Sequence, residues 1–248
     1  MAFMQPFNLD GFHSGGAADE QTTVIHLAMA QVGSVAGDQA LERWLTEDDR
    51  QGVNRADRLL CRALLRALLV ASTRVAAGRW HIAKTPGGKP IVSDSGGTRA
   101  PSVSISHSGG WSACALSFAG DVGIDIEQMR SDRDLPALAE RAFGSGECAE
   151  VAASGCSRFY AIWTLREAMA KAQGIGLAMA ADRKDRFVGV SDEGFQHLRV
   201  DVDSWQVMHQ ALDSGMSLAL ALRMPAHSAA SPALRWWCAE PQPTSATS

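Results

Sequence analysis

The stretch from Asp121 to Glu127, Asp-Val-Gly-Ile-Asp-Ile-Glu, constrains the fold more than any other part of the chain. Apolar residues alternate there with glycine or an acid, which is the period-two pattern of a strand with one buried face. Residues two apart on a strand project from the same face, so Asp125 and Glu127 are expected to lie close together. Like charges this close repel unless a cation compensates them. The pattern therefore predicts a strand that presents two carboxylates to a positive partner.

A third acid follows in the run from Phe159 to Lys171, which has the spacing of a helix. Its apolar residues recur three and four apart and would face a core, namely Ile162, Leu165, Met169 and Ala172. Glu167 and Lys171 lie one turn apart on another face. Alone, they would be read as a surface ion pair worth about 0.2–0.5 kcal/mol. The acidic pair upstream instead favours a shared site.

Three carboxylates without a cysteine and histidine cluster favour a hard cation. We expect Asp125, Glu127 and Glu167 to bind Mg²⁺, with Mn²⁺ as an alternative, because these ions prefer oxygen ligands. Zinc is disfavoured by the same lack of cysteine and histidine ligands.

Four short motifs occur in a fixed order along the chain. They are Gly88-Lys89-Pro90, Ser-Ile-Ser-His-Ser-Gly over 104–109, Val-Gly-Ile-Asp-Ile-Glu over 122–127, and Trp-Thr-Leu-Arg-Glu-Ala-x-x-Lys-Ala-x-Gly-x-Gly-Leu over 163–177. Together they resemble the signatures of the 4′-phosphopantetheinyl transferase superfamily, the surfactin-synthetase-activating (Sfp) type in particular. The resemblance covers the chain from about residue 55 to Leu177, and four motifs in order are more specific than any one alone.

The resemblance implies an α+β fold with two similar halves in a pseudo-dimer. Each half would be a small antiparallel sheet packed with a long helix, with the active site at their interface. The N-terminal half would span 23–120 and contact the phosphates of coenzyme A. The C-terminal half, 121–225, would hold the metal site, and 1–22 and 226–248 would be flexible tails.

The implied activity is transfer of the 4′-phosphopantetheine group from coenzyme A to a serine of an apo acyl or peptidyl carrier protein. The transfer would depend on Mg²⁺ and release 3′,5′-ADP. Glu167 would act as a third metal ligand, as the base for the carrier serine, or as both. Lys171 would hold a phosphate or the leaving group. The alternatives are a non-catalytic coenzyme A or nucleotide-binding module and a phosphohydrolase acting on a small nucleotide.

The resemblance implies coenzyme A contacts for residues whose local sequence alone would suggest a structural or surface role. Lys89 lies in a Pro- and Gly-rich turn, which is more often only a turn with a surface lysine. His107 follows a strand, where a lone histidine is usually structural. The resemblance assigns Lys89 and His107 to the phosphates and places Ser106 against the coenzyme.

A long helix is predicted from Asn54 to Ala77, ended by Gly78. Its arginines recur at three and four residues, in the order Arg55, Arg58, Arg62 and Arg66. Such a stripe is commonly a solvated face. The resemblance implies that a basic residue here contacts coenzyme A, and both Arg55 and Arg58 are candidates.

The segment after the acidic strand is basic and is then predicted to be helical over 135–143. By resemblance it borders the carrier-protein surface, where Arg130, Arg133, Arg141 and an exposed Phe143 would meet an acidic helix. Two residues depart from the family pattern: Arg166 stands where lysine is usual, and Ser104 stands where asparagine is usual.

Further strands are predicted from apolar or alternating runs at 23–32, 80–83, 103–106, 111–118, 198–202, 205–209 and 217–223. A short helix is expected at 38–45, and much of the chain after Pro225 is expected outside the core. The net charge of −4 gives no general reason to expect nucleic-acid binding. Five cysteines without a Cys-x-x-Cys pair, no apolar run of membrane-spanning length and no signal sequence predict reduced thiols in the cytoplasm. The type resembled is often monomeric.

Overall fold

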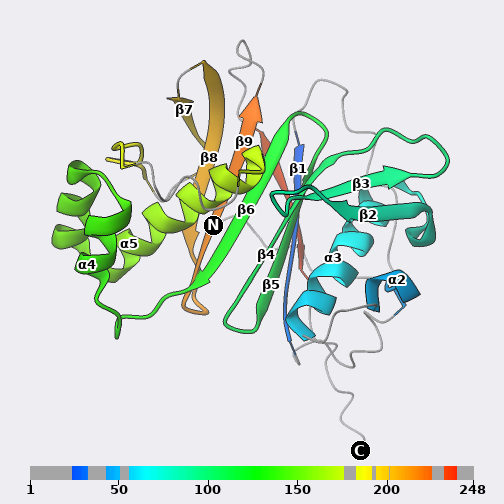
Figure 1. Cartoon of the computed structure of the whole chain (residues 1–248), viewed down its shortest axis with the longest axis horizontal. Helices are drawn as coiled ribbons and strands as arrows, with labels where there is room; N and C mark the ends of the chain where they lie inside the picture. The colour runs from blue at the N-terminus through cyan, green and yellow to red at the C-terminus, as the bar shows by residue number, and fades with distance from the viewer. Residues whose placement is uncertain are drawn as a thin grey trace, which may run out of the picture.

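The computed structural model describes residues 24–32, 43–50, 56–175, 183–191, 194–200, 202–224 and 232–238. These residues form a mixed α+β fold, as predicted, and within them lie two four-stranded sheets, a two-stranded sheet and two long helices (Figure 1). Some expectations lie outside the described residues: the tail over 1–22, most of the helix over 38–45, the start of the long helix at Asn54, and Arg55. No helix in the described ranges is long and apolar enough to cross a membrane.

The first four-stranded sheet has the order β10-β1-β5-β4. Its strands are β1 (Val24–Gln31), β4 (Ser102–Ser108), β5 (Trp111–Ser117) and β10 (Ala233–Cys238). β5 pairs antiparallel with both β1 and β4, but β10 pairs parallel with β1, so this sheet is mixed and not wholly antiparallel as expected. Strand β10 corrects the expectation of a flexible tail over 226–248 for residues 233–238, while 226–231 and 239–248 lie outside the described residues. Its apolar run extends the sheet at the open edge of β1, which the pattern of the tail alone did not indicate.

Helix α3 (Ala56–Thr73) covers one face of this sheet, and its buried leucines pack against Val103 and Leu116. The helix ends at Thr73 and not at Ala77. Arg74 adopts a left-handed conformation with φ 59°, which breaks the helical repeat. The residues up to Arg79 then form the short 3₁₀ helix η1 (Ala77–Arg79), which leads into a hairpin of β2 (Trp80–Lys84) and β3 (Pro90–Asp94). Before α3 lies the four-residue helix α2 (Glu47–Arg50).

The second four-stranded sheet is antiparallel, in the order β6-β9-β8-β7. Its strands are β6 (Asp121–Gln128), β7 (Gln196–Val200), β8 (Asp203–Ala211) and β9 (Met216–Met224). The alternating stretch from Asp121 to Glu127 is therefore a strand, as predicted, and it lies at an edge of this sheet. The three strands predicted after residue 197 are also confirmed, with small shifts at their ends.

Helix α5 (Ser145–Gln173) covers the face of the second sheet that carries Gly123. A Cβ atom at Gly123 would lie 1.8 Å from the carbonyl oxygen of Ala168, so glycine is required for this close approach. The helix begins at Ser145, well before the predicted Phe159. Gly155 interrupts it with φ 70° and ψ −140°, so α5 is two helical segments joined at a kink.

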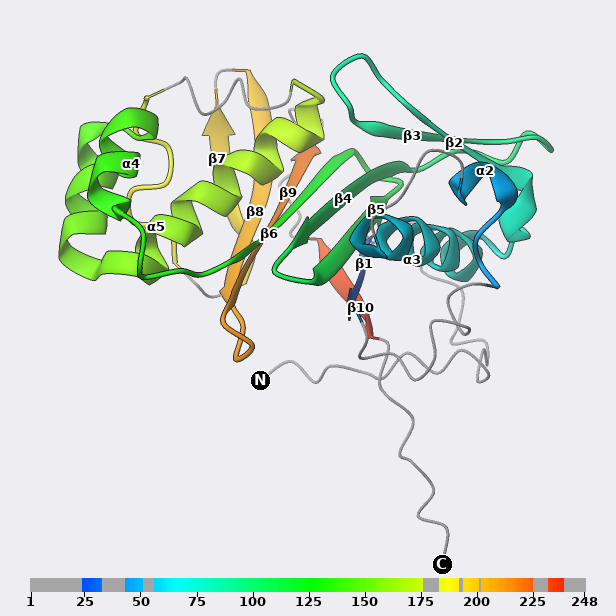
Figure 2. The ribbon, with the colours of Figure 1, turned by 60° about the horizontal axis from the view of Figure 1, so that its bottom comes forward.

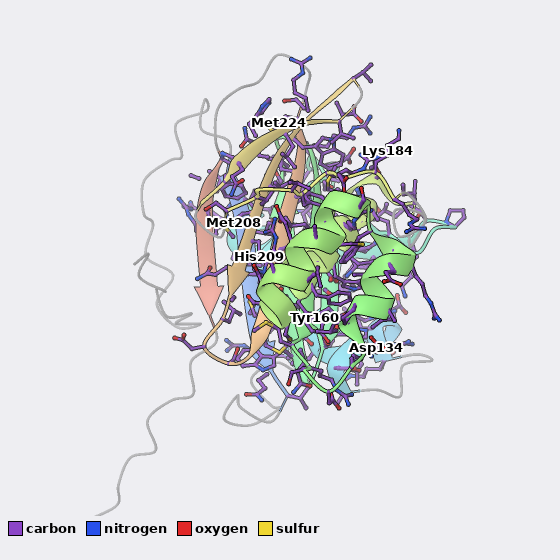
Figure 3. The ribbon with its side chains drawn as sticks, turned by 90° about the vertical axis from the view of Figure 1, so that its left-hand side faces the viewer. Asp134, Tyr160, Lys184, Met208, His209 and Met224 are labelled. Carbon is purple, nitrogen blue, oxygen red and sulfur yellow. The ribbon has the colours of Figure 1, made fainter. Side chains whose placement is uncertain are left out.

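Helix α4 (Leu135–Ala142) packs beside the first segment of α5 (Figure 3). Asp134, labelled at its start, caps it by accepting a hydrogen bond of 3.1 Å from Ala137 N. Phe143 follows the helix and is 0% exposed, which contradicts its predicted place on a carrier-binding surface. Its ring packs 5.3 Å from that of Phe159 and 6.5 Å from that of Trp163, measured between centroids. The apolar core thus takes up this side chain.

The two four-stranded sheets pack against each other through an apolar core. This core joins Ile25 and Leu27 of β1 to Ile124 of β6 and to Leu218 and Leu220 of β9. The edge strands β4 and β6 lie side by side at the junction, as both ribbon views show (Figure 2). They remain in different sheets, so we call the line between β4 and β6 the seam.

Candidate active site at the seam

Serine side chains, and not a backbone ladder, join β4 to β6 across the seam. Every second residue of β4 is a serine whose hydroxyl oxygen accepts a hydrogen bond from a backbone N–H of β6. The four bonds run from Val122 N to Ser102 Oγ (3.1 Å), Ile124 N to Ser104 Oγ (3.1 Å), Ile126 N to Ser106 Oγ (3.3 Å) and Gln128 N to Ser108 Oγ (3.2 Å). These four hydrogen bonds therefore fix the register of β6 relative to β4 along the seam.

Asp125 lies at the centre of this seam and is 3% exposed. Its Oδ1 accepts from Ser106 Oγ at 2.9 Å and from Lys171 Nζ at 2.6 Å. Lys171 Nζ also donates to Ser106 Oγ at 2.8 Å, so the three side chains form a closed triangle. Among the described residues no donor reaches the buried Oδ2 of Asp125. A buried carboxylate oxygen without a donor is suited to a cation.

Glu127 follows Asp125 on the same face and accepts a hydrogen bond of 2.8 Å from Ser108 Oγ to its Oε2. Burial and the charge of Asp125 raise the pKa of Glu127, while the bond from Ser108 and the charge of Lys171 act in the opposite direction. The charge of Asp125 thus acts on Glu127 in the direction expected for two neighbouring carboxylates.

Glu167 belongs to the same electrostatic cluster, although it lies on α5. Burial raises its pKa to about 7, and the charges of Asp125 and Glu127 add to this effect. Lys171 opposes the shift, because its ammonium group favours the ionised carboxylate. The close packing of α5 on Gly123 brings the helix to this point of the strand. Three acids and one lysine from two elements therefore influence one another's ionisation beside the seam.

These side chains fit a hard cation by their chemistry but do not form a finished cage. In the part of the chain that the structure describes, no three His, Cys, Asp or Glu side chains already stand in a metal-binding arrangement. Lys171 occupies one oxygen of Asp125, and Ser108 occupies one oxygen of Glu127. The available ligands are carboxylate oxygens, which suits Mg²⁺ or Mn²⁺ better than zinc.

A buried polar bridge supports α5 just beside this cluster. His209 Nε2 lies 2.9 Å from Ser217 Oγ, which lies 3.2 Å from Thr164 Oγ1 on α5. Ser217 is the cross-strand partner of Glu127, and Thr164 precedes Glu167 by nearly one turn. Figure 3 labels His209 on β8, near the helix. The bridge helps to fix the position of α5 over β6, and the sequence analysis did not identify it.

Lys89 was predicted to contact coenzyme A, and the structure places it at the C-terminal end of α5. Its Nζ donates to the carbonyl oxygen of Ala172 and lies 3.4 Å from Asp121 Oδ1. A cation at this end of a helix is favourable because the last carbonyl groups carry partial negative charge. Gly87 in the same turn lies against the backbone of Gly174. The turn thus connects the β2–β3 hairpin to the second half of the molecule.

His107 points away from the seam, because neighbouring residues of a strand project from opposite faces. Its Nδ1 lies 3.5 Å from Asp57 Oδ2 in the first turn of α3. His107 is therefore separated from the acidic cluster by the strand itself, and it faces the helix that carries Arg58.

The arginines of α3 do not form one continuous basic face. Arg66 is 3% exposed and its guanidinium contacts the carboxylate of Asp49 and the carbonyl oxygen of Trp80, the latter at 2.9 Å. Arg62 also pairs with Asp49, at 3.3 Å. These two arginines are therefore neither on a solvated stripe nor at a phosphate site, because they anchor α2 and β2. Arg58 is exposed.

Arg166, which stands where the family usually has lysine, points away from the acidic cluster. It is 2% exposed and pairs with Glu147, which is 0% exposed. Its guanidinium also donates to the carbonyl oxygen of Lys184 at 2.8 Å and lies 5.3 Å from the centroid of the Phe143 ring. The forked guanidinium makes several contacts that a lysine ammonium would not reproduce. Its role is structural.

Three arginines are exposed after β6, two in the loop that leads to α4 and one in the last turn of α4. Arg130, Arg133 and Arg141 all lie at the surface. Arg130 pairs with Asp132 at 2.7 Å, and the charge of Arg133 acts on the carboxyl group of Glu127. This surface thus begins beside the acidic cluster.

Comparison with known proteins identifies the part of the chain that holds the cluster. Residues 121–222 match the family model described as the 4′-phosphopantetheinyl transferase superfamily. The match contains all three acids and Lys171, and it confirms the predicted family.

Three curated relatives agree with this assignment. The 4′-phosphopantetheinyl transferase HetI of Nostoc sp. is 31% identical over 121 residues, which is 47% of this chain and 51% of the relative. The 4′-phosphopantetheinyl transferase AcpT of Salmonella typhi is 38% identical over 128 residues, 50% of this chain and 62% of the relative. A Synechocystis sp. protein provisionally given the same activity is 29% identical over 182 residues, 72% and 70%. The chain thus spans between about half and about two thirds of these relatives.

Proposed function

We propose that this chain transfers the 4′-phosphopantetheine group of coenzyme A to a serine of an apo acyl or peptidyl carrier protein. The observation that carries the proposal is the convergence of Asp125, Glu127, Glu167 and Lys171 at the seam, inside the segment that matches the superfamily. The relatives named 4′-phosphopantetheinyl transferases support the same reaction class. The proposed type is the surfactin-synthetase-activating one.

A Mg²⁺ ion, or Mn²⁺ in its place, would be held by Asp125, Glu127 and Glu167. The buried Oδ2 of Asp125, which no described donor reaches, supports this assignment. Such an ion supplies positive charge that neutralises the phosphate oxygens of a bound substrate.

The chain's own residues would position the reactants and move the proton. The carrier serine attacks the phosphorus atom attached to pantetheine, and the bond from that phosphorus to the 3′,5′-ADP oxygen breaks. Glu167 would accept the serine proton, because a carboxylate positioned beside the reacting hydroxyl can act as a general base. Lys171, which now donates to Asp125, would donate to the phosphate or the leaving group. Most of the rate gain would come from orientation and charge stabilisation.

Coenzyme A would extend from the seam toward α3. His107 and Arg58 border that path, because His107 projects from β4 toward the first turn of the helix. Ser106 would lie against the coenzyme while its hydroxyl stays bonded to Asp125. Lys89 would need to leave the carbonyl of Ala172 to reach a phosphate. Arg55 remains a candidate of the same proposal, outside the described residues.

The carrier protein would dock on the exposed arginines that follow β6. Arg130, Arg133 and Arg141 suit an acidic helix, and Arg133 acts electrostatically on Glu127. The proposal also includes a monomeric protein in the cytoplasm, with 23–120 and 121–225 as two similar halves of a pseudo-dimer. A sheet and a long helix in each half support that division, although the first sheet also takes in β10 from beyond both ranges.

Mass spectrometry of an apo carrier protein incubated with the chain, coenzyme A and Mg²⁺ tests the proposal. The carrier should gain the mass of one phosphopantetheine group. The variants Asp125→Ala, Glu127→Ala and Glu167→Ala should abolish the gain, while Glu47→Gln, an exposed carboxyl change on α2, should leave it intact. Tight coenzyme binding with no gain on several carriers would point to a binding module. Release of 3′,5′-ADP without a carrier would point to a phosphohydrolase.

A further inference from the structure

The four serines of the seam make the same hydrogen bond to the backbone of β6 but differ in their hydrogen bonds to its acidic side chains. All four accept a hydrogen bond from an N–H group of β6. Within the described ranges, only Ser106 and Ser108 also donate a hydrogen bond to a carboxylate of that strand, at 2.9 and 2.8 Å. Ser106 is already part of the proposed coenzyme site, so Ser108 is the residue that no role yet explains.

The two hydrogen bonds of the Ser108 hydroxyl fix the direction in which its O–H group points. A serine hydroxyl has one donor and two acceptor positions. The N–H of Gln128 takes an acceptor position at 3.2 Å, so the O–H is left to donate to Glu127 Oε2 at 2.8 Å. The carboxylate is held because the hydroxyl is itself held by the neighbouring backbone.

The turn after Ser108 limits movement of this side chain. Gly109 has φ 56°, a conformation that suits glycine, and a Cβ atom there would lie 2.7 Å from Gln128 Oε1. The β4–β5 turn thus packs against the residue that follows Glu127. Ser108 is fixed through its own strand, through Gln128 and through the turn.

We propose that Ser108 is a positioning residue that holds the Glu127 carboxylate at the orientation needed for binding a divalent cation. This inference rests on the metal site of the proposed function. Carboxylates that bind metals are typically held by hydrogen bonds from neighbouring groups, and loss of such a partner typically costs about 10–100-fold in metal affinity. Ser108 does not touch the substrate or the cation.

Ser102 provides a matched control. It is half-buried, as Ser108 is, and it accepts one backbone hydrogen bond of 3.1 Å, but its described hydrogen bonds include no carboxylate. Ser102→Ala and Ser108→Ala should therefore lower the melting temperature by similar amounts. Only Ser108→Ala removes a hydrogen bond to an acid.

The test measures binding of Mn²⁺ alone, by electron paramagnetic resonance, to the full chain and its variants. Ser108→Ala should weaken Mn²⁺ binding by about 10-fold or more, while Ser102→Ala should bind as the wild type does. Ser108→Thr, which keeps a hydroxyl at this position, should restore most of the affinity.

Equal Mn²⁺ affinity of Ser108→Ala and the wild type would overturn the inference, as would equal losses in the two alanine variants. Absence of Mn²⁺ binding to the wild-type chain would overturn it as well. Failure of the proposed function would look different: the wild type would not modify any carrier, although Ser108→Ala still weakened Mn²⁺ binding selectively.

Discussion

Replacing Gly123 by alanine should damage both the fold and the site, because the strand and α5 meet there without space for a side chain. The added Cβ would lie 1.8 Å from the carbonyl oxygen of Ala168 and 2.7 Å from the amide nitrogen of Ala172. Contacts under 3.0 Å essentially do not occur for real Cβ atoms, so the carbonyl oxygen of Ala168 must retreat by at least 1.2 Å. Both obstructing atoms are backbone, and they cannot rotate away.

The expected loss has two components. Forcing an extra methyl group into a packed interface typically costs about 1–3 kcal/mol. Glu167 precedes Ala168, so the displaced helix carries this carboxylate away from Asp125. Misplacement of a reacting group by about 1 Å can reduce activity by about 100-fold.

Urea denaturation followed by circular dichroism gives the first component, and carrier modification per folded molecule gives the second. Gly78→Ala is the control, because a Cβ there meets no atom within 4 Å and the backbone needs no positive φ. It should be neutral within about 0.5 kcal/mol. A Gly123→Ala variant with wild-type stability and wild-type carrier modification would refute the close packing of α5 on β6.

Three further predictions concern single side chains. Arg166→Ala should lower the free energy of unfolding by about 3–5 kcal/mol in a urea titration, since it leaves the buried Glu147 unpaired. Arg166→Lys should lower it by less. Equal losses in the two variants would contradict the role of the guanidinium contacts. Burial, with the charge of Arg235, lowers the pKa of His26 to about 4, so between pH 6.5 and 4 the unfolded chain binds more protons and stability falls as pH falls. The loss should reach about 2–3 kcal/mol and be smaller in His26→Gln, and identical pH profiles would contradict it. Glu167→Gln should lower kcat for carrier modification by about 10²–10⁴-fold with the melting temperature retained, and an unchanged kcat would exclude Glu167 as the base.

The elements with a strict pattern could be predicted from the sequence. Alternation over 121–127 and the apolar run at 217–223 gave β6 and β9. The family motifs likewise indicated the acids that meet at the seam. Local pattern was sufficient because each of these segments has one face buried against a single neighbour.

Other features depend on contacts between distant segments, and the sequence pattern does not record those contacts. Arg66 was expected on a surface stripe, but Asp49 draws it into the interior. Phe143 was expected at the surface, but Phe159 and Trp163 provide an aromatic pocket for it. Strand β10 was missed because its partner, β1, lies at the other end of the chain. The seam serines were visible as an alternating run, although only the packing of β6 explains them.

The proposed function depends on one divalent cation that β6 and α5 bind together. A crystal structure of the chain soaked with Mn²⁺ and coenzyme A tests this most directly, through the anomalous signal of manganese. The account predicts one strong peak per chain, bonded to carboxylate oxygens of Asp125, Glu127 and Glu167. A peak elsewhere, or a coenzyme pyrophosphate bound at the seam without any manganese, would contradict it.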